Sequence, residues 1–215
     1  MFTGIVEEIG VIKNIKHGAK SSVLTIQGEI IFRDLKIGDS VAVNGVCLTA
    51  TNCSGNIFTA DAVYETLKRS SLGQLHPKSH VNLERAMHAN GRFGGHIVSG
   101  HIDGTGIIQR IEKYDNAVLF TVKADVSIMR YIVEKGSVAI DGISLTVADI
   151  FNGGFRVFVI PHTAKETILA EKVIGDIVNI ENDVVGKYVE NLMRFEQSVK
   201  PQNSLTKTFL EKYQF

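Results

Sequence analysis

Length, composition and charge limit what this chain can be. It has 215 residues, of which 44% are hydrophobic, enough for two small cores. Lysine plus arginine and aspartate plus glutamate both number 23, so we expect no nucleic-acid partner. The start lacks a basic, apolar leader and no stretch is long enough to span a membrane. We therefore expect a cytoplasmic protein with no membrane contact, in which Cys47 and Cys53 are free thiols.

The sequence states one pattern twice. Three blocks of the first half recur in the same order in the second half: 2–10 as 98–106, 40–49 as 137–146, and 81–84 as 178–181. A period of this length is that of a small domain and is typical of tandem duplication. Two copies of one binding unit suggest two copies of one ligand.

Most of each repeat consists of short segments rich in Val, Ile and Thr. Asn44-Gly45 lies between two such segments, and Asp141-Gly142 takes the same place in the second repeat. Such dipeptides between apolar runs predict tight hairpins. We therefore expect an all-β protein made of two tandem homologous antiparallel barrels.

Helices are expected at fewer places. Short ones are predicted at 64–72 and 162–169, with a further turn at Val126, Met129, Ile132 and Val133. The glycine-rich stretch 89–95 is a linker by composition. These patterns predict an N-terminal barrel over 1–96, a second barrel over 97–186 and a helical tail over 187–215.

Apolar residues near the end of the chain alternate in steps of three and four. They are Val185, Tyr188, Leu192, Phe195 and Val199. The spacing fits either a coiled-coil seam or a helix that packs on its own barrel. A second helical segment is expected around Leu205, Phe209, Leu210 and Tyr213.

The second repeat alone carries a polar, reactive set. His101, Ser144, His162 and Lys135 stand where the first repeat has Ile5, Cys47, Glu65 and Gly38. Ser144 and Thr146 share one strand face, as do Cys47 and Thr49, so each pair can line a pocket.

Each candidate also has a simpler structural interpretation. Ser144 could bond only to backbone, Cys47 could be a small buried hydrophobe, and Lys135 could be a solvated turn residue. His96 and His101 can serve as acid or base, or as simple hydrogen-bonding groups. A zinc site from His96, His101, Cys47 and Cys53 lacks any familiar ligand spacing, so we expect no metal.

Residues 1–7, 94–102 and 140–147 together closely resemble the riboflavin synthase family, and the match covers residues 1 to about 186. The resemblance implies two six-stranded Greek-key barrels that bind lumazine, with short helices, and a C-terminal α-helix that joins three chains. It implies a transferase that converts two molecules of 6,7-dimethyl-8-ribityllumazine, both held in one active site, into riboflavin and 5-amino-6-ribitylaminouracil. This is the last step of riboflavin biosynthesis, and the family uses no metal or redox cofactor.

The resemblance also implies the site residues. A first cradle would contain Gly4, Ile5, Val6, Cys47, Leu48, Thr49, Asp61, Ala62, Val63, Tyr64, Glu65 and Thr66. A second would contain Gly100, His101, Ile102, Lys135, Ser144, Leu145, Thr146, Ile160, Pro161, His162, Thr163, Ala164 and Lys165. The leading residues for proton transfer and activation of the nucleophile would be His101 and Ser144. His96, Cys47, Lys135, Thr146, Asp141, Ser40 and Asp183 would support them, and Phe2 would cover the bound ring. Tyr64 departs from the family, where a lysine or similar polar residue is common.

Each site would form between the N-terminal barrel of one subunit and the C-terminal barrel of its neighbour, and the homotrimer could associate with the lumazine synthase capsid. The main alternative is a lumazine protein, which shares both barrels and binds lumazine or flavin as a chromophore without turnover. Such proteins lose the polar set of the second barrel, which favours the enzyme here. An oligonucleotide-binding barrel would need a basic groove with exposed aromatics, against zero net charge and 7% aromatic residues.

Overall fold

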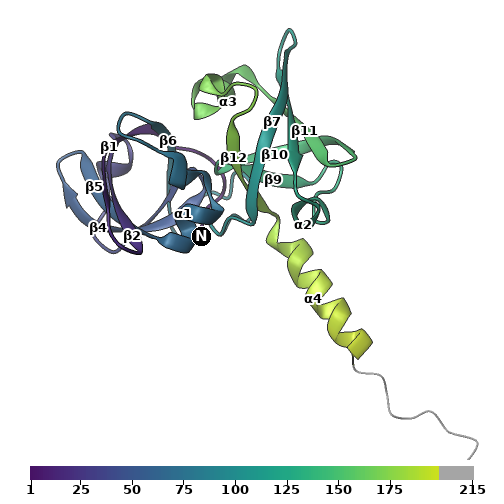
Figure 1. Cartoon of the computed structure of the whole chain (residues 1–215), viewed down its shortest axis with the longest axis horizontal. Helices are drawn as coiled ribbons and strands as arrows, with labels where there is room; N and C mark the ends of the chain where they lie inside the picture. Colours follow the sequence, from purple (N-terminus) through teal and green to yellow (C-terminus); the bar gives the residue numbers. More distant parts are fainter. Residues whose placement is uncertain (199–215) are drawn as a thin grey trace, which may run out of the picture. The chain divides into compact units, whose positions relative to one another are not determined.

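The computed structural model describes residues 1–198. Each repeat closes into a six-stranded antiparallel barrel, as predicted (Figure 1). The first barrel contains β1 (Glu8–His17), β2 (Ser21–Gln27), β3 (Ser40–Val43), β4 (Val46–Ser54), β5 (Ile57–Val63) and β6 (His80–Arg85). The second contains β7 (Gly104–Lys113), β8 (Val118–Ala124), β9 (Ser137–Ile140), β10 (Ile143–Phe151), β11 (Gly154–Val159) and β12 (Ile177–Asn182).

The strand order is the same in both barrels. In the first it is β1-β2-β5-β4-β3-β6, and the second follows it strand for strand. Strands β3, β4 and β5 are joined in succession, and the long connection from β2 places that strand beside β5, which is a Greek key. Closure pairs every strand on both sides, so neither barrel leaves an open edge.

The predicted hairpin turns lie where the sequence placed them. Asn44 and Gly45 connect β3 to β4 with φ angles of 47° and 79°, and Asp141 and Gly142 connect β9 to β10 with 45° and 81°. Two successive residues of positive φ match the twist of the flanking strands, and Asn, Asp and Gly adopt this conformation most readily. The barrel interiors are filled by separate apolar cores, around Phe58 in the first and Phe155 in the second.

Each predicted barrel helix is divided in two. Helix α1 covers Tyr64–Arg69 and is followed by the 3-10 turn η2 at Ser71–Gln74; α3 covers Pro161–Lys165 and is followed by η3 at Ile168–Glu171. The short helices predicted at 64–72 and 162–169 are therefore present, but they end earlier than predicted, at Arg69 and Lys165. Ser70 and Thr167 are extended, and their hydroxyls donate to the carbonyls of Thr66 and Thr163 at 2.6 and 2.7 Å. A side chain that competes for backbone partners ends a helix.

Three further helices complete the described elements. They are the 3-10 turn η1 (Ile31–Arg33), α2 (Val126–Met129) and α4 (Val184–Ser198). The predicted turn at Val126 is confirmed as far as Met129. Helix α4 carries the first four apolar residues of the predicted seam, while Val199 and the segment around Leu205 lie outside the described residues. None of the helices within residues 1–198 is long and apolar enough to cross a membrane.

The two barrels meet through equivalent residues. Phe2 pairs with Val98 as an isolated antiparallel bridge, and these positions correspond in the repeat. The turn glycines Gly45 and Gly142 also pack on one another, since a Cβ added to either would lie 2.7 Å from the backbone nitrogen of the other. Contacts between equivalent residues indicate a local two-fold relationship.

Buried asparagines fasten this interface. Asn82 donates to the carbonyl of Asp141 at 2.9 Å, and its equivalent Asn179 donates to the carbonyl of Asn44 at 2.8 Å. Their side-chain oxygens accept from the amides of Ile168 and Ser71. Both amide side chains are therefore satisfied across the interface, as buried polar groups require.

Candidate functional site

The two repeats exchange their glycine loops, which are residues 3–6 and 99–102. The carbonyl of Gly4 accepts a hydrogen bond from the amide of Ser144 at 2.8 Å, whereas the carbonyl of Gly100 accepts from the amide of Cys47 at 2.9 Å. Each loop therefore contacts the strand of the other repeat that carries the candidate residue, Ser144 or Cys47. Within the chain, this arrangement differs from the sequence-based grouping, which kept each loop with its own repeat.

Glycine is required at both contacts. Gly4 has φ of 76° and Gly100 of 82°, a region that favours glycine. A Cβ at Gly4 would lie 2.7 Å from Cβ of Ser144, and one at Gly100 would lie 2.5 Å from Cβ of Cys47. The bare backbone is what allows each loop to approach its strand.

Apolar packing agrees with the exchange. Val6 and Ala164 pack on the core of the second barrel, whereas Ile102 and Leu67 pack on the core of the first. We therefore define a Ser144 cradle, formed by residues 4–6, 144–146 and 160–165. Its counterpart, the Cys47 cradle, is formed by residues 47–49, 61–66 and 100–102.

The Ser144 cradle contains a close histidine–serine pair. Nδ1 of His96 lies 2.7 Å from Oγ of Ser144, and the His96 side chain is buried. Burial lowers the pKa of His96, and the nearby charge of Asp183 only partly opposes this shift. A neutral imidazole has one nitrogen free to accept a proton, so it can orient the hydroxyl and take up its proton.

The Cys47 cradle surrounds a hollow of about 190 Å³. Cys47, Thr66, His101 and Ile102 line it, beside the ion pair between Glu65 and Arg69. His101 is exposed there and, among the contacts of the described residues, has none to Ser144. The histidine and serine that the sequence placed together therefore belong to different cradles, and the partner of Ser144 is His96.

Two predicted ligand contacts are buried in the interface between the barrels. Phe2 is fully buried and packs with Ala42, Val98 and Ala139, so within this chain it covers no open site. The carboxyl of Asp141 is also fully buried; it accepts from the amide of Asn179 at 2.8 Å and pairs with Lys172 at 3.3 Å. Phe2 thus packs between the barrels, whereas the Asp141 carboxyl binds partners of its own repeat.

Three further predicted residues lie with their side chains in the barrel walls. Leu48, Ala62 and Leu145 belong to the apolar cores, because alternate residues of a strand face inward. Only their backbone groups can reach a ligand. Their neighbours Thr49, Asp61, Val63 and Thr146 are exposed.

The remaining predicted residues are accessible. Lys135 stands before β9 with φ of 63°, and its Nζ donates to the carbonyl of Ala148 at 3.0 Å. On the helices of the two cradles, exposed positions are Tyr64, Glu65, Ile160, Pro161 and His162, with Thr163 and Ala164 half-buried and Lys165 exposed. Ser40 lines a cavity of about 560 Å³ together with Ile5 of the Ser144 cradle, Glu84 and Arg85.

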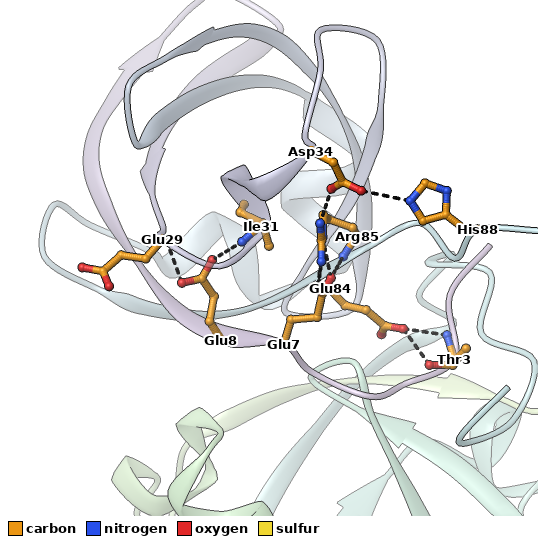
Figure 2. A network of polar contacts seen from close by, with 9 residues as sticks. All are labelled: Thr3, Glu7, Glu8, Glu29, Ile31, Asp34, Glu84, Arg85 and His88. Atoms are coloured by element: carbon orange, nitrogen blue, oxygen red, sulfur yellow. Dashed lines mark hydrogen bonds and ion pairs between the residues drawn. The ribbon is translucent and has the colours of Figure 1, made fainter. Parts of the chain in front are cut away.

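Sequence reasoning missed the polar groups that support the cradles. Glu84 and Glu181 each bind a glycine loop. Arg85 joins Glu7 and Asp34, and Nε2 of His88 lies 3.0 Å from Oδ2 of Asp34 (Figure 2). The signal was present, since the blocks 81–84 and 178–181 match and both end in glutamate. Within residues 1–198, no three His, Cys, Asp or Glu side chains form a metal-binding group.

Comparisons with known proteins agree with this architecture. The family described as "Lumazine binding domain" matches residues 3–86 and 99–183. The chain is 54% identical to the riboflavin synthase of Actinobacillus pleuropneumoniae and 48% identical to that of Bacillus subtilis (strain 168), in each case over 215 residues and the whole of both chains. Among solved structures, LumP complexed with riboflavin superposes with a TM-score of 0.79 at 23% identity, covering 85% of this chain and 99% of LumP. LumP complexed with 6,7-dimethyl-8-(1'-D-ribityl) lumazine gives a TM-score of 0.77 at the same identity and coverage. At this identity LumP supports the fold alone.

Proposed function

The chain belongs to the riboflavin synthase family, and we propose that it converts two molecules of 6,7-dimethyl-8-ribityllumazine into riboflavin and 5-amino-6-ribitylaminouracil. A four-carbon unit passes from one lumazine to the other. Donor and acceptor are the same compound, which explains why one binding unit occurs twice. Holding the two rings in a productive orientation supplies much of the rate enhancement.

The observation that carries this proposal is the pair of His96 and Ser144. The substrate's own ring makes its 7-methyl protons acidic and accepts electrons, so the protein must position the rings, exclude water and move protons. A neutral His96 held 2.7 Å from Ser144 suits that task. His101 and Cys47, in the other cradle, are proposed to contact the second lumazine and to assist proton transfer there.

We propose that each complete site joins the Cys47 cradle of one subunit to the Ser144 cradle of the next. One chain carries one cradle of each kind, so a ring of three subunits would form three such sites. The apolar residues of α4 are proposed to assemble the trimer. The proposed domain boundaries are 1–96, 97–186 and 187–215, the proposed location is the cytoplasm, and association with the lumazine synthase capsid stays a prediction for co-elution to check.

Turnover of the lumazine alone tests the function. The purified protein is mixed with 6,7-dimethyl-8-ribityllumazine, without metal or nucleotide, and riboflavin is followed by absorbance, fluorescence and chromatography. One riboflavin for every two lumazines consumed would support the synthase. Tight binding with a spectral shift and no product would instead support the alternative, a chromophore-binding protein without turnover.

The oligomer is tested separately. Cutting the chain after Gly186 removes most of α4 and should give monomers that still bind riboflavin, measured by light scattering and fluorescence titration. A truncated protein that remains trimeric and active would contradict the role of α4.

A further inference from the structure

A buried carboxylate on the first barrel holds the glycine loop that reaches the second. Glu84, near the end of β6, is only 5% exposed. Its Oε1 accepts from the amide and the hydroxyl of Thr3 at 2.7 and 2.9 Å (Figure 2). Its Oε2 accepts from the amide of Gly4 at 3.1 Å. Three donors thus converge on one buried carboxyl group, and a buried donor left without an acceptor is costly.

The opposite edge of the same loop binds the histidine–serine pair. The carbonyl of Thr3 accepts from the amide of His96 at 3.1 Å, and the carbonyl of Gly4 accepts from the amide of Ser144 at 2.8 Å. The N–H groups of the loop therefore bind Glu84, while its carbonyls bind both members of the pair. One dipeptide, Thr3-Gly4, lies between the carboxylate and the two reactive side chains.

Little free space separates the loop from Gly95 and Ser144. A Cβ added to Gly95, next to His96, would lie 2.1 Å from the Thr3 carbonyl oxygen and 3.0 Å from Oγ of Ser144. A shift of the loop therefore moves the backbone of His96 or Ser144 rather than being absorbed locally. Proton transfer depends steeply on such distances.

The second repeat has an equivalent glutamate that binds its glycine loop, but within the described part of the chain this loop does not bind a histidine–serine pair. Glu181 accepts from the amide and hydroxyl of Ser99 at 2.7 and 2.6 Å and from the amide of Gly100 at 3.0 Å. Gly100 in turn accepts from the amide of Cys47. Glu181 thus binds the glycine loop of the Cys47 cradle in the same way, and it provides an internal control for Glu84.

We propose that Glu84 is a positioning residue for the reaction: by holding Thr3-Gly4, it sets the geometry between His96, on the connection between the barrels, and Ser144 in the second barrel. The expected effect of Glu84 on the reaction rate rests on the proposed function. The hydrogen bonds of the Glu84 carboxyl go to Thr3 and Gly4 and not to His96 or Ser144, so we expect its effect on the pair to be carried through the loop. Glu181 does the same for the Cys47 cradle.

Glu84→Gln in the full chain tests the proposal. The amide keeps the shape of the carboxylate but replaces one acceptor oxygen by a group that cannot accept, so at least one loop donor loses its partner. We expect kcat to fall about tenfold or more with KM nearly unchanged, because ground-state binding is retained. Thr3→Val, which removes only the hydroxyl bond, should give a smaller fall of about two- to threefold, and Ser99→Ala is its counterpart in the second repeat.

A spectroscopic measurement separates this inference from the proposed function. The nitrogen chemical shift of the His96 ring reports its bond to Ser144 without any substrate. Glu84→Gln should shift that signal and Glu181→Gln should leave it in place, even if the protein makes no riboflavin. An unchanged His96 signal and an unchanged kcat in Glu84→Gln would overturn the proposal. So would equal effects of both glutamine variants on His96. If Glu84→Gln does not fold, the His96 signals of Thr3→Val and Ser99→Ala are compared instead. Thr3→Val should shift the signal and Ser99→Ala should not; equal effects would overturn the proposal.

Discussion

The ring nitrogen Nδ1 of His96 and the hydroxyl oxygen of Ser144 lie 2.7 Å apart, although 48 residues separate them along the chain. The two residues lie on different elements: His96 belongs to the connection between the barrels and Ser144 to β10. Their contact places a buried proton acceptor beside a partly buried hydroxyl. The first two predictions concern this pair.

Ser144→Ala and His101→Ala should lower kcat far more than they weaken binding. Positioned proton transfer contributes about 10²- to 10⁴-fold to a rate, so a loss of that order is expected for Ser144→Ala, with the riboflavin Kd within about threefold. His96→Gln should resemble Ser144→Ala, and His76→Gln, on an exposed turn, serves as the control. Steady-state kinetics and fluorescence titration measure both quantities; equal losses in turnover and binding would remove the catalytic assignment.

Gly95→Ala should impair turnover without unfolding the barrels. The added methyl group would meet the Thr3 carbonyl and Cβ of Ser144 at 2.1 and 2.9 Å, so the loop or the serine must move. Gly94→Ala is the matched control, because its methyl group meets only the flexible side chain of Ile5, at 3.2 Å. We expect at least about a tenfold fall in kcat for the first and a much smaller one for the second. Similar kinetics for the two variants would contradict the tight packing described above.

Substitutions of Asp141 and Lys172 should have coupled effects on the unfolding free energy. The first repeat has Asn44 and Leu75 at the same positions. Burial raises the pKa of Asp141, and Lys172 partly offsets that shift. Lys172→Leu leaves a buried carboxyl without its partner and should cost about 3–5 kcal/mol of unfolding free energy. The double variant Asp141→Asn with Lys172→Leu reproduces the pair of the first repeat and should recover most of this loss. Urea unfolding of the wild type, both single variants and the double variant measures the coupling; simple additivity would contradict it.

Glu84 should make stability depend on pH. Burial, with a smaller contribution from the charge of Glu7, raises its pKa from the usual 4.5 to about 7. Between these values the folded protein binds more protons than the unfolded chain, so the contribution of this group is full below about pH 4.5 and is lost as the pH rises through about 7. The loss is at most about 3 kcal/mol.

Glu84→Gln should remove this slope. Unfolding free energies of the wild type and the variant between about pH 5 and about pH 8 give the difference, in which the pH dependence of groups that the substitution leaves unchanged cancels. A constant difference across this range would show that the folded protein does not hold the Glu84 carboxyl at a raised pKa.

The sequence by itself determined the repeat, the fold class and the turn positions, because these depend on local chemistry. Asn44-Gly45 and Asp141-Gly142 prefer the positive φ angles that a tight hairpin requires, and alternating apolar residues fix which face of each strand is buried. It also identified Ser144, His96 and Cys47 as residues that can act as nucleophile, acid or base, since residue type alone sets that capacity. Helix ends were less predictable, because the hydroxyls of Ser70 and Thr167 compete with the backbone.

Only the tertiary structure decided which residues meet. The exchange of glycine loops, the pairing of Ser144 with His96 rather than His101, and the burial of Phe2 and Asp141 all depend on how the barrels pack. Those contacts join residues far apart in sequence, such as Thr3 and Glu84, which are separated by 81 positions. A repeat in sequence states that two units are alike; the two-fold packing between them decides that each completes the cradle of the other.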